Sequence, residues 1–243
     1  YSKLSETEDR RGISVTMQSW AGPVLSNPVI ENGLMVKGTA VVKPIVYNAD
    51  YSADSTLRSV GWNNRVTVGA WTGTIDFSSS NAERREVNRS IWASRGTDTM
   101  DFDYTGGGAP RLSFSNAYTD PATVKVGSLF GNAYYTSPII NDKIDAIKFS
   151  GRRSFEESVF TSVEFGLNQS QRDKQRKFIE TSIPNTNAVF AGSSLNAPQS
   201  GVFGVPNSLS VNVDAALASN FGAYTPAVLV PWGATGQWTI TEK

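Results

Sequence analysis

Alternation of apolar and polar residues is the feature of this sequence that most restricts its fold. Successive side chains of a β-strand point to opposite faces, so a period of two marks a strand with one apolar and one polar face. The apolar positions of the clearest segments are Trp62, Val66, Val68 and Ala70; Trp71, Ile75 and Phe77; Ile147 and Phe149; and Val159, Val163, Phe165 and Leu167. With weaker patterns added, we predict an all-β, antiparallel chain of about six long strands, near residues 1–18, 54–70, 71–92, 141–153, 158–182 and 236–243.

Charge and composition exclude several classes of function. The 243 residues include 22 Lys and Arg, 22 Asp and Glu, no His and no Cys. A formal net charge of zero provides no general attraction for nucleic acid. Without Cys and His there can be no disulfide, thiolate zinc site or Ser-His-Asp triad, and no convergent pair of acids stands out. We therefore expect a protein that is not an enzyme, uses no cofactor or metal, and binds no nucleic acid.

No stretch of the sequence reads as a transmembrane helix. The longest uncharged stretches, 181–213 and 215–241, are broken by prolines and rich in Gly, Ser, Asn and Thr, whereas a spanning helix needs about 20 mostly apolar residues. The strand pattern continues close to both ends of the sequence. From this we expect residues 1–243 to form one partial domain of a larger protein.

The polar face of the predicted strands carries charge, and its candidate lining residues are Arg65, Asp76, Lys148 and Glu164. In a soluble β-sandwich this face would point to bulk water, and the apolar faces would meet in a dry core. In a membrane barrel the charged face would line the lumen, and the apolar face would contact lipid. Alternation by itself is compatible with both arrangements.

The predicted connections alternate between short and long. Residues 69–73 and 154–158 join neighbouring strands almost directly, whereas 94–140 and 184–236 are long. Long segments without strands are unusual inside a compact domain. Short periplasmic turns alternating with long extracellular loops are typical of outer-membrane barrels. The connections therefore favour an antiparallel transmembrane β-barrel segment.

Two of the predicted strands also have a similar charged sequence at the end that lies away from the short turns. Phe77 and Phe165 are each followed, seven residues later, by the first arginine of a charged run, Arg84 and Arg172. A strand whose apolar face gives way to mixed charge extends from an apolar environment into water. Charges at such a boundary can contact lipid headgroups. Solvated hairpin ends of an ordinary sheet remain an alternative explanation.

Segments 69–80, 102–114, 141–172 and 238–243 resemble, in order along the chain, the β-barrel of TonB-dependent outer-membrane receptors. The resemblance implies a mid-barrel fragment that lacks the plug domain and the C-terminal strands, in the cell outer membrane of a Gram-negative bacterium. It also implies contacts with outer-membrane lipid and, in the full-length protein, with a plug domain and TonB. The implied function is energised uptake of a small organic ligand, with carbohydrate or another complex organic compound favoured over a siderophore.

Aromatic and acidic residues of the long loops are the candidates for ligand binding: Asp101, Asp103, Tyr104, Tyr118, Tyr134, Tyr135 and Trp232. Aromatic faces beside polar side chains suit sugars and other polar organic ligands. The alternative is that these rings pack the loops together. Residues 207–222 have the composition of a short helix capped by Ser or Asn and ended by Gly222. A soluble, secreted all-β module for glycan binding or adhesion remains the alternative function.

Overall fold

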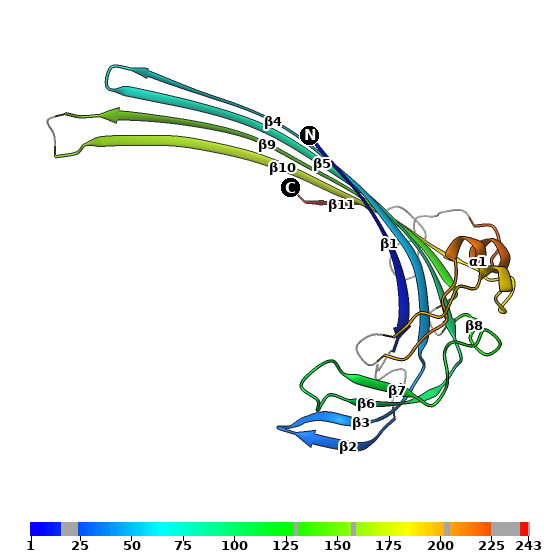
Figure 1. The fold of residues 1–243 in the computed structure, drawn as a ribbon. Helices are drawn as coiled ribbons and strands as arrows, with labels where there is room; N and C mark the ends of the chain where they lie inside the picture. Colours follow the sequence, from blue (N-terminus) through cyan, green and yellow to red (C-terminus); the bar gives the residue numbers. More distant parts are fainter. Residues whose placement is uncertain (16–23, 129–130, 157–158, 202–204, 225–238, 243) are drawn as a thin grey trace.

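The structure is a computed structural model that describes residues 1–15, 24–128, 131–156, 159–201, 205–224 and 239–242. Over these residues it is all-β apart from one helix and one 3-10 turn, and its strands pair antiparallel in two sheets (Figure 1). The larger sheet has the order β1 (Ser2–Ser14), β4 (Ile45–Val68), β5 (Trp71–Ser94), β9 (Ala133–Ser154), β10 (Ser162–Ile183) and β11 (Thr239–Glu242), with β8 (Lys125–Val126) beside β5. The smaller sheet has the order β2 (Leu25–Glu31), β3 (Leu34–Val42), β6 (Asp98–Asp103) and β7 (Arg111–Phe114).

All six predicted strands are present, and the antiparallel all-β prediction is confirmed. Two strands are longer than predicted, because β4 begins at Ile45 rather than at 54 and β9 begins at Ala133 rather than at 141. The description of 94–140 and 184–236 as loops was wrong in part. The first contains β6, β7, β8 and the start of β9, and the second contains the 3-10 turn Gly192–Ser194 and α1 (Val213–Asn220).

The two long hairpins keep one register over their whole length. Gly69 has a φ of +57°, and with Ala70 it forms the two-residue turn between β4 and β5, where glycine supplies the left-handed conformation that such a turn requires. The β4–β5 pairing runs from Ile45 opposite Ser94 to Val68 opposite Trp71 without a shift. The β9–β10 pairing is equally regular. Because no bulge intervenes, each face of this sheet keeps the same set of alternate residues from end to end.

The main core lies at one end of the large sheet only. We call the segments 115–128, 184–201 and 205–224, which include α1, the loop lobe. Its apolar residues pack on the sheet residues Val46, Ile91, Ala93, Ala133 and Ile183. In Figure 1 α1 lies outside the bend of the strands, while the hairpin ends extend away from it.

Polar contacts hold the loop lobe to the sheet. Buried Asn48 of β4 accepts a hydrogen bond from the Val211 amide at 3.0 Å and donates to the Leu209 carbonyl at 3.4 Å. The helix α1 lies within the predicted segment 207–222, and the Asn212 side chain caps it by accepting from the Ala215 amide at 2.9 Å. The lobe is therefore an ordered layer over the sheet.

The smaller sheet has its own core of Ala40, Val42, Met100 and Phe102. Its first hairpin turns at Asn32 and Gly33, both with positive φ, as a two-residue Asn-Gly turn requires. At the start of β6, the buried carboxylate of Asp98 accepts hydrogen bonds from the Tyr118 hydroxyl at 2.9 Å and the Asn116 side-chain amide at 2.7 Å. Asp98 thus connects the smaller sheet to the loop lobe.

Candidate functional site

One face of the hairpin half of the large sheet is apolar and uncovered. Register places on this face a set of large side chains that are each 36–78% exposed, which we call the apolar belt. Its members are Val60, Trp62, Val66, Val68, Trp71, Ile75, Phe77, Ile147, Phe149, Val163, Phe165 and Leu167. The same face is buried under the loop lobe at the other end of the strands, so a single sheet face has two different environments.

The apolar belt has a defined height and a charged border. From Val60 to Val68 it covers about 26 Å of strand at roughly 3.3 Å per residue, which strand tilt reduces to about 20 Å of vertical height. The same face becomes charged at this border: Asp145 lies in the cross-strand row of Val60, Arg58 and Lys143 lie in the next row, and Lys143 pairs with Asp145 at 2.8 Å. An outer-membrane barrel has an apolar band about 25 Å tall, which is close to the height of this belt.

The four residues predicted to line a lumen all lie on the opposite face of the sheet: Arg65, Asp76, Lys148 and Glu164. Asp76 stands directly opposite Lys148, and Glu164 stands directly opposite Arg152. The Asn63 side chain donates to Asp76 at 2.9 Å. Opposite charges in facing cross-strand positions stabilise a sheet modestly, so this face is built as a charge-matched polar surface.

Aromatic and basic side chains mark the hairpin end of the apolar belt. The Arg153 guanidinium lies 5.4 Å from the Trp71 ring centroid and 5.1 Å from that of Phe155. Val159 and Phe160, in the β9–β10 connection, are strongly exposed. Aromatic rings together with long basic side chains are typical of the boundary between lipid and water.

Above the level of the belt, an arginine organises the polar face. Arg84 of β5 donates hydrogen bonds to Glu86 at 2.7 Å, to the Tyr51 hydroxyl at 2.9 Å and to Ser55 at 3.0 Å. Its ion pair with Glu6 is 3.4 Å long. The hydrogen bonds that Arg84 donates to Glu86 and Tyr51 raise its pKa above the ordinary value. Arg84 thereby connects β1, β4 and β5 on one face.

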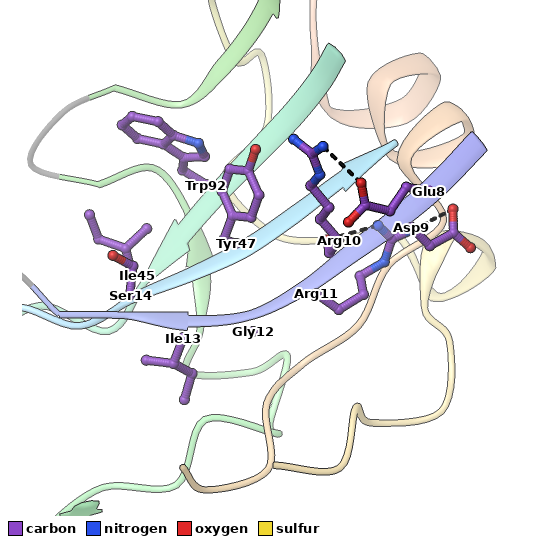
Figure 2. Close-up of a pocket in the computed structure, with 10 residues that line it drawn as sticks. All are labelled: Glu8, Asp9, Arg10, Arg11, Gly12, Ile13, Ser14, Ile45, Tyr47 and Trp92. Atoms are coloured by element: carbon purple, nitrogen blue, oxygen red, sulfur yellow. Dashed lines mark hydrogen bonds and ion pairs between the residues drawn. The ribbon is translucent and has the colours of Figure 1, made fainter. Parts of the chain in front are cut away.

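Next to this network, β1, β4 and β5 form a pocket of about 740 Å³ (Figure 2). Glu8, Arg10, Tyr47 and Trp92 project to the same side of the strands, and the Arg10–Glu8 ion pair is 2.8 Å long. None of these four residues was predicted as a site residue. The alternation of Tyr47, Ala49, Tyr51 and Ala53 was the available signal, but the strand was predicted to begin only at residue 54.

The predicted loop aromatics are placed in three different environments. Tyr118 is 1% exposed, and its hydroxyl donates to Asp98, so it packs the loop lobe and is not open to a ligand. Burial and this hydrogen bond raise its pKa. Tyr135 lies 6.0 Å from the Tyr224 ring against the main core. Tyr134 lies on the polar face, 4.9 Å from the ring of Trp92, and is the one of these three beside the pocket.

Three of the other predicted ligand residues, Asp101, Asp103 and Tyr104, lie in β6 or directly after it. Asp101 accepts a hydrogen bond from Thr39 at 2.6 Å. Asp103 accepts two from Thr105, which lower its pKa, and pairs with Lys37 at 3.4 Å. Tyr104 is exposed beside Phe102. Trp232 lies outside the described residues. Within the part of the chain that the structure describes, no three acidic residues are grouped as metal ligands.

Comparisons of the chain with protein-family models, curated proteins and solved structures gave no match. Among the described residues, no helix has the length and apolar character needed to span a membrane. The features of the described residues that bear on function are the apolar belt, the charged face behind it and the pocket formed by β1, β4 and β5.

Proposed function

We propose that this chain is part of the β-barrel of a TonB-dependent receptor that takes up a nutrient across the outer membrane of a Gram-negative bacterium. The observation that supports the proposal most strongly is the apolar belt, which is exposed over four neighbouring strands and ends at a charged row. Soluble monomers rarely expose apolar patches of more than a few hundred Å². Lipid contact accounts for such a surface, and the charged rows then mark the edge of the membrane.

The opposite face and the open edges fit the same arrangement. Asp76, Lys148, Arg152 and Glu164 cannot lie in hydrocarbon without a large free-energy cost, so this face lines a water-filled interior. The outer edges of β1 and β11 end the sheet among the described residues. In lipid, unpaired strand edges are not tolerated, so further strands of the larger protein complete the barrel.

The orientation follows from the two ends of the sheet. The short β4–β5 turn and the β9–β10 connection lie at one end, and the loop lobe and smaller sheet lie at the other (Figure 1). Outer-membrane barrels keep short turns in the periplasm and place large loops outside. The loop lobe and smaller sheet are therefore extracellular, and in the complete receptor a plug and TonB would act from the periplasmic side. The ligand is a small organic compound, with carbohydrate favoured.

The alternative, a soluble secreted module for glycans or adhesion, requires a cover for the apolar belt. Both core clusters of the described residues lie at the lobe end and in the smaller sheet, and the side chains of the belt remain 36–78% exposed. A membrane therefore explains the belt more simply than a dry core does.

The proposal is tested by expressing the full reading frame that contains this chain in a Gram-negative host. We expect the protein in the outer-membrane fraction, with a gel mobility that changes when the sample is boiled, because a closed barrel resists detergent until heated. A soluble product with no heat-dependent shift would contradict the proposal and favour the secreted module.

A further inference from the structure

The pocket on the polar face has an aromatic wall that a glycine leaves open. Gly12 of β1 stands directly opposite Tyr47 of β4, and facing residues of paired strands project to the same side. A Cβ at Gly12 would meet no atom within 4 Å. No side chain from β1 therefore covers Tyr47 at this position. Trp92 of β5, paired with Tyr47, provides the second ring of the wall.

The charged residues of the pocket balance one another. Glu8 and Asp9 are opposed by Arg10 and Arg11. Arg11 is nearly buried, pairs with Asp50 at 2.8 Å and donates to the Ala49 carbonyl. It therefore joins β1 to β4. Arg10 pairs with Glu8, which lowers the pKa of Glu8 and raises that of Arg10. Both therefore stay charged near neutral pH, and the lining has no net charge.

The Glu8–Arg10 pair remains open to a ligand. The Arg10 side chain is 39% exposed and that of Glu8 is 50% exposed, and the Arg10 guanidinium lies 4.1 Å above the Tyr51 ring, which fixes its position. A carboxylate with a free lone pair and a guanidinium with free N–H groups offer adjacent acceptors and donors. Neighbouring hydroxyl groups, each both donor and acceptor, match such a pair.

We propose that this pocket binds a neutral saccharide, with a sugar ring stacked on Tyr47 beside Trp92 and its hydroxyls bonded to Glu8 and Arg10. The apolar C–H face of a sugar suits an aromatic ring, and the volume of about 740 Å³ is that of a small-molecule site. A highly charged ferric chelate finds no excess of opposite charge here. The inference rests on the proposed function in one respect, namely that the polar face opens to water inside the barrel.

The test uses the full-length protein that contains this chain, purified in detergent, and isothermal titration calorimetry. The probes are linear hexamers of glucose, xylose, mannose and N-acetylglucosamine, with a galacturonic acid trimer as the charged comparison. We expect at least one neutral hexamer to bind, and Tyr47→Ala to weaken that binding about tenfold or more, since loss of a stacked aromatic anchor costs at least ~1.4 kcal/mol. Gly12→Leu, which fills the space before Tyr47 and removes no existing contact, should weaken it similarly.

Tyr1→Ala is the matched control, because Tyr1 is an exposed tyrosine outside the pocket and is not among the candidate ligand residues. Its affinity should equal that of the wild type, and a preserved heat-dependent gel shift shows that each variant is folded. The inference is overturned if no neutral hexamer binds at millimolar concentration, if only the acidic trimer binds, or if Tyr47→Ala and Gly12→Leu both keep the wild-type affinity. A soluble protein that binds a neutral hexamer through Tyr47 would refute the membrane proposal and retain the saccharide site.

Discussion

Phe165→Arg is expected to reduce sharply the amount of full-length protein that assembles in the outer membrane. Phe165 lies in the apolar belt of β10, 52% exposed, with its ring over Gly151 and 6.3 Å from the Phe149 ring. An arginine on the lipid face near the bilayer midplane costs roughly 2–4 kcal/mol. The heat-modifiable form should therefore decrease, and the urea midpoint of the assembled fraction should fall. Val163→Arg, one row nearer the hairpin end, should act in the same direction.

A matched control distinguishes the effect of the sheet face from the effect of introducing an arginine. Ser78 is on the polar face of β5, where it faces Gly61 and Ala146 and has room for a longer side chain. Ser78→Arg should assemble like the wild type, whereas Phe77→Arg, one residue earlier and on the belt, should not. Glu164→Gln should also be tolerated. Equal yields for Phe77→Arg and Ser78→Arg would refute the assignment of the two faces.

Asp98→Ala is expected to destabilise the loop lobe and the smaller sheet by about 3 kcal/mol, because hydrogen bonds to a buried charge contribute more than neutral ones, and their loss leaves donors unsatisfied. The Asp98 carboxylate is nearly buried and accepts from the Thr99 amide at 2.7 Å, from Asn116 and from Tyr118. Its loss leaves the Tyr118 hydroxyl without this acceptor in the main core. Tyr118→Phe, which removes one of these bonds, should cost about 1 kcal/mol.

The measurement for Asp98→Ala is hydrogen exchange, which reports local opening. Exchange should accelerate at Tyr118 and in the neighbouring loop lobe but remain unchanged in the hairpin half of β9 and β10. Asp101→Ala is the control, since Asp101 is an exposed acid of the same strand with a hydrogen bond from Thr39, and its effect should stay within about 0.5 kcal/mol. Similar exchange in both variants would mean that Asp98 does not hold the lobe to the smaller sheet.

The hairpin half of the fold was predictable because its signal is local. Trp71, Ile75 and Phe77 alternate with polar residues, and Gly69 marks the turn. The first part of β4 was missed because the positions that follow Val46 on the core face, Asn48, Asp50 and Ser52, are polar. Asn48 is buried only because the backbone at Leu209 and Val211 supplies its hydrogen bonds, and a partner that distant in the chain cannot be inferred from periodicity.

The sequence of the smaller sheet contains a local signal for its first hairpin. Asn32 and Gly33 stand between the apolar residues Val29, Ile30 and Leu34, and Asn-Gly between apolar residues is a strong indicator of a hairpin. The pocket was harder to predict from the sequence. Tyr47 meets Arg10 and Gly12 only through the β1–β4 register, which is set by non-local pairing and not by any short motif.

Single-cysteine scanning of β10 in intact outer membranes tests the central claim most directly, because residues 1–243 contain no cysteine. Cysteines would be introduced one at a time at 163, 164, 165, 167 and 168 in the full-length protein. We predict that positions 164 and 168 react with a water-soluble maleimide, whereas 163, 165 and 167 are protected from it and their attached fluorophores are quenched by a bilayer-embedded nitroxide. Equal reactivity at all five positions, without a period of two, would contradict a strand with one face in lipid and the other in water.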